Sequence, residues 1–133
     1  LEKTRNMEGE SIREVVRGDT PENWSNQLYY RYWMHMTHHD NPAHYGIRTR
    51  DYKLIFFYGL PLDATGALEQ PTPSGWELYD LRKDPKELNN VYNDPDYAEV
   101  VVELKKQLFQ MKNDLGDIDD KYPELVRNIE ESV

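Results

Sequence analysis

Alternation of apolar and polar positions with a period of two predicts four strands in the middle of the chain. These strands cover residues 27–35, 44–50, 52–58 and 76–81. The first is dense in aromatic residues, which favour strands, and its alternation puts Tyr30 on one face and Arg31 with His35 on the other. In the second strand the apolar Tyr45 and Ile47 are expected to face the core.

The polar positions of that second strand, His44 and Arg48, should then lie together on the opposite face. A tight turn near Arg50 and Asp51 is expected to join it to the third strand in a hairpin. Residues 59–75, which carry three Gly and three Pro, predict a long loop before the fourth strand. Loops of that length are usually functional or mobile.

A period of 3.6 replaces the period of two toward the C-terminus and predicts a helix over 96–115. Asp94 is suited to cap its first turn, and Gly116 is suited to end it in a left-handed conformation. The apolar stripe of this helix should cover the sheet. It consists of Tyr97, Val100, Val101, Leu104, Leu108, Met111 and Leu115.

The flanking segments are more polar. Residues 1–26 are interpreted as an N-terminal connecting segment with a short helix in "SIREVVRG", which should pack on something outside the chain. Residues 117–133 are interpreted as an acidic tail with a weak helical turn after Pro123. The fold class predicted for 27–116 is α+β, with a four-stranded antiparallel sheet covered by a long C-terminal helix.

Composition limits the functions that this domain could have. The net charge of −9 argues against a general nucleic-acid binder, because neutralising phosphates needs surplus Lys and Arg. No apolar run approaches the length that crosses a membrane. The chain contains no cysteine, which excludes disulfides, thiolate zinc sites and a cysteine nucleophile. Between Gln27 and Gly59, however, four basic residues accompany only two acidic ones, a local balance suited to a small anionic ligand.

All four histidines lie in "HMTHHDNPAH", residues 35–44. A zinc site is one interpretation, but the adjacent His38 and His39 rarely point at one ion in an extended segment, and no HExxH helix is present. Solvated loop positions are the plain alternative, since loops tolerate polar residues. Anion binding is the third, because a histidine beside an arginine suits a sulfate or carboxylate.

For the anion interpretation, His44 and Arg48 are predicted to bind one sulfate or carboxylate group together from the same strand face. Arg31 and His35 are expected to extend this site across the sheet. His38 and His39 are the further candidates for substrate binding, and no catalytic or metal-binding residue is assigned.

Two stretches, "HYGIRTRDYKLI" and "WELYDLRKDPKELNNV", together resemble the C-terminal subdomain of the type I, formylglycine-dependent sulfatases, as found in bacterial polysaccharide and aryl sulfatases. The upstream "MEGESIREVVRGDTPENWSNQLYYRYW" is similar to the family's approach to this subdomain. The resemblance covers roughly residues 7–115. It implies a small antiparallel sheet covered by a long helix, which agrees with the fold predicted from the residues.

The resemblance also implies a function. The chain would pack on the N-terminal catalytic domain of the same protein, and "HMTHHDNPAH" would line the pocket for a sulfated saccharide or aryl sulfate. Calcium and formylglycine are expected in the parent enzyme, which the resemblance places in the periplasm or outside the cell. This chain has no cysteine and no serine in a Ser-x-Pro-x-Arg motif, so it should not hydrolyse sulfate esters alone. The alternative is a stand-alone binding or structural module, which a complete gene without that motif would indicate.

Overall fold

The structure is a computed structural model that describes residues 9–132. Its centre is a single antiparallel sheet of four strands in the order β1-β2-β3-β4. The strands are β1 (Leu28–Tyr32), β2 (His44–Arg48), β3 (Tyr52–Phe57) and β4 (Gly75–Asp80). The predicted α+β fold with a four-stranded antiparallel sheet is confirmed; β1, β2 and β3 are one to four residues shorter than their patterns suggested, and β4 has the predicted length but begins one residue earlier.

The strand register decides which side chains share a face. Tyr32 is opposite His44, and Arg31 is opposite Tyr45. The turn between β2 and β3 is where the sequence put it, with the Thr49 amide donating to the Tyr52 carbonyl at 2.8 Å. Gly46 in the middle of β2 has no room for a side chain, because a Cβ there would lie 2.5 Å from the Leu54 carbonyl oxygen.

The long helix follows a short 3-10 turn, η1 (Pro95–Tyr97), and extends as α2 (Ala98–Asp114). The Asp94 carboxylate accepts from the Asp96 amide at 3.0 Å, which confirms the predicted cap, and Gly116 ends the helix at φ 69°. Leu104 and Leu108 are the buried centre of the stripe. The stripe does not continue to Leu115, which is 43% exposed, because the buried position in that last turn belongs to Lys112.

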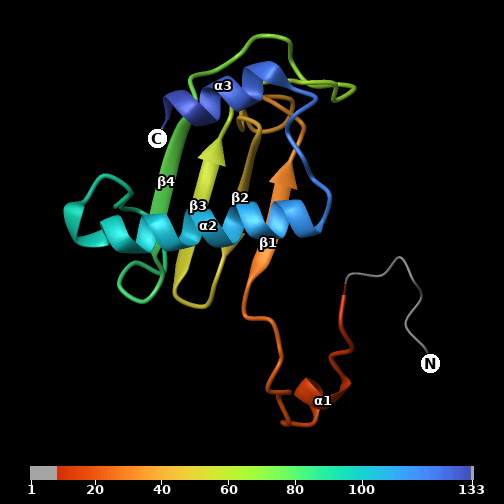
Figure 1. The fold of residues 1–133 in the computed structure, drawn as a ribbon, viewed down its shortest axis with the longest axis vertical. Helices are drawn as coiled ribbons and strands as arrows, with labels where there is room; N and C mark the ends of the chain where they lie inside the picture. Colours follow the sequence, from red (N-terminus) through yellow and green to blue (C-terminus); the bar gives the residue numbers. More distant parts are fainter. Residues whose placement is uncertain (1–8, 133) are drawn as a thin grey trace.

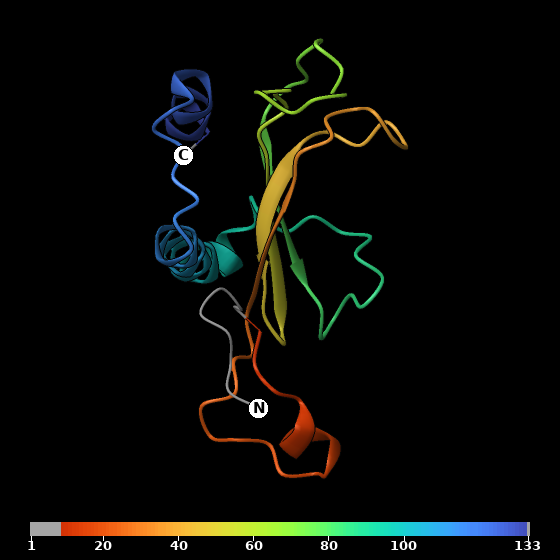
Figure 2. The ribbon, with the colours of Figure 1, turned by 90° about the vertical axis from the view of Figure 1, so that its right-hand side faces the viewer.

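A second helix, α3 (Pro123–Glu131), lies beside α2 on the same side of the sheet (Figures 1 and 2). Its Leu125 is fully buried in the core, and the Asn128 amide donates to the Tyr58 carbonyl at 3.1 Å. The stretch from residue 117 was interpreted as an acidic tail with one weak helical turn. In the structure it carries nine residues of helix and adds to the core.

Both helices cover one face of the sheet, and no helix of residues 9–132 covers the other face (Figure 2). The covered face holds the core, in which the largest fully buried side chains are Tyr45, Tyr58, Phe56, Ile47, Leu54, Leu78, Leu108, Leu125 and His35. The histidine-rich connection from β1 to β2 and the segment from β4 to η1 extend toward the side without a helix.

The N-terminal segment carries the short helix α1 (Arg13–Val16), which lies apart from the sheet (Figure 1). Its apolar Ile12 and Val16 are 62% and 76% exposed, so nothing within residues 9–132 covers them. Among these residues no helix combines the length and apolar character that a membrane span requires.

Candidate functional site

Residues 33–43, here called the histidine loop, connect β1 to β2. His38 and His39 are exposed at its tip. Three of its residues other than glycine have positive φ, namely Met36 (56°), His39 (60°) and Asp40 (50°). Each such residue costs about 1–2 kcal/mol, and such strain clusters where a loop must keep one shape for a ligand or partner. The Met36 amide, donating to the Asn41 carbonyl at 2.9 Å, helps to close the loop.

Residues 58–74, here called the long loop, connect β3 to β4 and lie against the histidine loop at one end of the sheet (Figure 1). The Thr37 hydroxyl donates to the Gly66 carbonyl at 2.6 Å, and the Leu68 amide donates to the His35 carbonyl at 2.9 Å. The Tyr58 and Gly59 amides both donate to the Ala43 carbonyl. The two loops therefore form one hydrogen-bonded unit.

His35 is the buried centre of this unit, with 0% of its surface exposed. The Ala43 amide donates to its Nδ1 at 3.1 Å, and its Nε2 lies 2.9 Å from the Gln70 carbonyl oxygen. Because Nδ1 accepts, the ring is neutral and Nε2 carries the proton that it donates to Gln70. Both ring nitrogens are thus used inside the protein, and neither is free for a ligand.

His44 lies at the start of β2 among aromatic rings on the face without a helix. Its ring is stacked on Tyr32 at 5.4 Å and tilted against Phe57 at 4.9 Å. Nδ1 donates to the Pro42 carbonyl at 2.8 Å, and no other hydrogen bond from residues 9–132 reaches the ring. Burial lowers the pKa of His44, with the charge of Lys53 acting in the same direction. A neutral His44 therefore offers Nε2 as a hydrogen-bond acceptor.

A pocket of about 450 Å³ is lined by two residues that contact His44, although His44 itself is not part of its lining. It shares Pro42 and Phe57 with the surroundings of His44 and extends to Glu77 and Asn90. An aromatic wall beside carboxylate and amide groups is the mixture that small polar ligands with an apolar ring face require.

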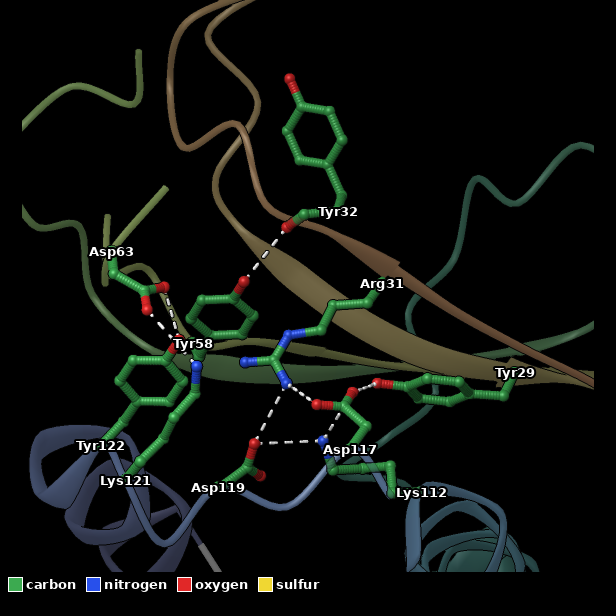
Figure 3. Close-up of polar contacts among 10 residues, drawn as sticks. All are labelled: Tyr29, Arg31, Tyr32, Tyr58, Asp63, Lys112, Asp117, Asp119, Lys121 and Tyr122. Carbon is green, nitrogen blue, oxygen red and sulfur yellow. Dashed lines mark hydrogen bonds and ion pairs between the residues drawn. The ribbon is translucent and has the colours of Figure 1, made fainter. Parts of the chain in front are cut away.

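Arg31 points to the opposite, helix-covered face, where it joins a buried ionic cluster with Lys112, Asp117 and Asp119 (Figure 3). Its Nη1 lies 2.5 Å from Asp117 and 3.1 Å from Asp119, and its guanidinium stacks 3.8 Å above the Trp33 ring.

Lys112 contacts both carboxylates of this cluster, at 3.3 Å from Asp117 and 3.2 Å from Asp119. The Tyr29 hydroxyl also donates to Asp117. The two basic and two acidic side chains balance in charge. The cluster fastens the connection between α2 and α3 to β1.

Burial and charge act against each other in the titration of this cluster. Burial alone would raise the pKa of Asp117, but the Tyr29 hydroxyl and the charges of Lys112 and Arg31 together hold that pKa below its usual value. For Lys112 burial dominates, so its pKa is lowered although Asp119 acts in the opposite direction.

The predicted substrate-binding residues are therefore not brought together. The register puts Arg31 on the opposite face from His44 and Arg48, so the expected extension across the sheet is wrong. His44 and Arg48 do share a face, but four residues of extended strand separate their Cα atoms by about 13 Å. Arg48 instead pairs with Glu87 at 3.6 Å.

Sequence reasoning missed the partners of these residues. The long loop was recognised as a candidate from its length, yet its pairing with the histidine loop has no signal in the residue pattern. The carboxylates Asp117 and Asp119 were placed in a tail, and Tyr32 and Phe57 were treated only as strand residues. Among residues 9–132 no three His, Asp or Glu side chains lie close enough to hold a metal ion.

Comparison with known proteins gives a consistent result. The chain matches the family described as "N-sulphoglucosamine sulphohydrolase, C-terminal" over residues 1–114. It is 34% identical over 128 residues to a curated N-acetylglucosamine-6-O-sulfatase of Bacteroides thetaiotaomicron, and these residues are 95% of this chain. The chain spans 21% of the length of that relative.

Solved structures show the same similarity. One is a protein in complex with its substrate, D-glucosamine-2-N,6-O-disulfate, which superposes with a TM-score of 0.73 and 32% identity over 92% of this chain and 23% of that one. A 2-O GAG sulfatase superposes with a TM-score of 0.65 over 91% of this chain and 23% of that one. Its identity of 21% supports the shared fold alone.

Proposed function

The chain belongs to the sulfatase C-terminal family described as "N-sulphoglucosamine sulphohydrolase, C-terminal". From this family membership we propose that the chain packs on a sulfatase catalytic domain and lines the pocket for a sulfated saccharide. A C-terminal sulfatase domain implies an N-terminal catalytic domain. One observation supports this role. The histidine loop and the long loop are hydrogen-bonded to each other at the end of the sheet, and the imidazoles at the loop tip are exposed.

Two surfaces are suited to packing on the catalytic domain. The sheet face without a helix carries half-buried Tyr30, Tyr32 and Phe57 beside charged residues, as interfaces between domains often do. The apolar Ile12 and Val16 of the N-terminal segment are uncovered and lie outside the domain core. Covering both surfaces would leave the two paired loops at the border between the domains, where substrate pockets commonly lie.

The proposed role of His44 follows from its protonation state. As a neutral ring with Nε2 free, it would accept a hydrogen bond from a sugar hydroxyl, and the adjoining rings of Tyr32 and Phe57 would contact the apolar face of the sugar. His38 and His39, which are exposed at the loop tip, would meet the anionic sulfate or a second sugar unit. The sulfated-saccharide class is supported by the substrate named for the solved relative.

The formylglycine and calcium of the reaction are proposed for the catalytic domain. The residues of this chain do not fit either group, because the chain has no cysteine and residues 9–132 bring no metal-binding set together. No step of sulfate-ester cleavage is therefore assigned to this domain, and its contribution is to bind and orient the sugar.

The test is made in the full-length enzyme with His44→Ala, assayed on a sulfated saccharide and on a small aryl sulfate. Losing one hydrogen bond and part of an aromatic contact should cost about 1–2 kcal/mol of binding in the transition state, which lowers kcat/KM for the saccharide roughly five- to thirtyfold. The kcat/KM for the aryl sulfate should stay nearly unchanged. Arg48→Ala is the matched control, because it changes the same face about 13 Å away. Equal losses on both substrates, or equal losses in the two variants, would exclude the proposed role.

A further inference from the structure

One buried side chain, that of His35, bonds to both the histidine loop and the long loop. His35 bonds Ala43 at the end of the histidine loop through Nδ1 and Gln70 in the long loop through Nε2. Its carbonyl accepts from the Leu68 amide at 2.9 Å. A single residue thus contributes three hydrogen bonds to the arrangement of two loops that are far apart in the sequence.

We propose that His35 is a positioning residue that fixes the two loops as one rigid unit and thereby sets the shape of the proposed saccharide rim. This inference rests on the proposed function for its effect on substrate, but the coupling of the loops is independent of it. His35 does not touch substrate in this proposal, because its side chain is completely buried.

No other residue type supplies this connection. The two bonds need an acceptor at Nδ1 and a donor at Nε2, which only the neutral imidazole in this tautomer offers from one ring. Breaking either bond leaves a polar backbone group of a loop without its partner, and a group that loses its partner in a buried site is costly. The other bonds between the loops lie elsewhere: the Thr37 hydroxyl bonds to Gly66 nearer the exposed tip, and the Tyr58 and Gly59 amides bond to the Ala43 carbonyl where the loops meet the strands.

The loops need such a connection because their own backbone is strained. Met36, His39 and Asp40 hold positive φ angles in the histidine loop, and Leu62 has φ 47° in the long loop. Strained segments keep one conformation only when the surrounding contacts determine it. His35 directly precedes Met36 and bonds to both loops.

Three variants of His35 separate its two bonds. His35→Asn keeps an acceptor near the Nδ1 position for the Ala43 amide and loses the Gln70 bond. His35→Gln keeps a donor near the Nε2 position for Gln70 and loses the Ala43 bond. His35→Phe keeps a ring of similar size and loses both bonds, so it tests hydrogen bonding apart from the filling of space.

The measurement is amide hydrogen exchange in the full-length enzyme, followed by peptides from 33–43, 58–74 and 98–114. We expect faster exchange mainly in the long loop for Asn, mainly in the histidine loop for Gln, and in both loops for Phe, with α2 unchanged in all three. His38→Asn, an exposed histidine of the same loop, is the matched control and should leave exchange unchanged. Unchanged loops in the Phe variant, or faster exchange spread equally into α2, would overturn the proposal.

Kinetics on the same variants distinguish this inference from the proposed function. If both are right, His35→Phe raises KM for a sulfated saccharide by roughly ten- to hundredfold with a smaller change in kcat, and Asn and Gln each restore part of the loss. Faster loop exchange with an unchanged KM would support the positioning of the loops by His35 and refute their role in the substrate pocket.

Discussion

The buried cluster of Arg31, Lys112, Asp117 and Asp119 is expected to stabilise the domain through its charge balance. Arg31→Met keeps most of the aliphatic volume of the side chain and removes its charge, which leaves two carboxylates with the single ammonium of Lys112. Removing one partner of a buried ionic group costs about 3–5 kcal/mol, because the remaining charge lacks compensation.

Two features of the structure place Arg31→Met at the lower end of that range. Lys112 remains 3.2–3.3 Å from both carboxylates and compensates part of the lost charge. Among residues 9–132 no hydrogen-bond partner meets the buried Nε and Nη2 of Arg31, so their removal relieves a cost already present. We expect a loss of about 3 kcal/mol from the free energy of unfolding, a large part of the stability of an ordinary domain.

Urea unfolding of the chain, followed by far-UV circular dichroism, measures this loss without relying on Trp33, whose ring contacts Arg31. Arg31→Met combined with Asp119→Asn leaves the cluster with one positive and one negative charge, so its charges balance again. The double variant should therefore be more stable than the sum of the two single effects predicts, by about 0.5–3 kcal/mol. Lys121→Met is the control, because the Lys121 to Asp63 pair is 63% and 66% exposed and should contribute little to stability. Strictly additive effects, or a loss from Arg31→Met no larger than that of the control, would refute the charge-balance argument.

The remaining predictions concern the helix and two titrating groups. Leu104→Asp puts a charge at a position 4% exposed in the centre of the α2 stripe and should unfold the chain, whereas Val102→Asp, at a position 70% exposed, should not. Equal melting of the two variants, followed by circular dichroism, would contradict the packing of α2 on the sheet. Because the pKa of His44 is lowered in the folded state, the unfolded chain binds more protons than the folded chain below about pH 6.5. The free energy of unfolding should therefore fall as pH decreases from there through the lowered pKa. His44→Gln should remove this pH dependence in urea titrations. The pKa of Asp117 is also lowered, so its contribution is present above the ordinary carboxylate range and should disappear as pH falls through its folded-state pKa, a loss that Asp117→Asn should abolish.

The pattern of the sequence predicted the sheet and α2 because each buries one face and therefore repeats with its own period. The alternation of β2, with Tyr45 and Ile47 fully buried, and the cap at Asp94 are examples in which local chemistry and the fold agree. The last helix was underestimated although its sequence carries the helical spacing. Leu125 is buried and Ile129, four residues further on, packs against the core, but the helix has only nine residues and stands in an acidic stretch.

The candidate site was predicted less well because it depends on strand register. Within one strand, the sequence shows which residues share a face, but it does not show how the faces of two strands correspond. Arg31 and His44 would share a face if β1 were shifted by one residue against β2, and an eleven-residue loop leaves both registers open. The observed pairing of Arg31 with Tyr45 turns the guanidinium toward α2 and the acidic residues behind it.

The clustering of all four histidines in ten residues suggested one shared site, yet the structure gives them three different environments. His35 is completely buried with both nitrogens bonded, His44 is half buried with one nitrogen bonded, and His38 and His39 are exposed. A neutral imidazole donates and accepts from opposite sides of one ring, so the same residue type suits a buried link between loops and a ring with one unbonded nitrogen beside Tyr32 and Phe57. His35 accepts from the Ala43 amide through Nδ1, so this nitrogen is committed inside the protein, whereas the side chains of His38 and His39 are exposed at the loop tip. In the proposed saccharide rim, a contact to the sulfate would therefore come from the tip of the loop, while His35 would give the loop its shape and His44 would supply an uncharged contact.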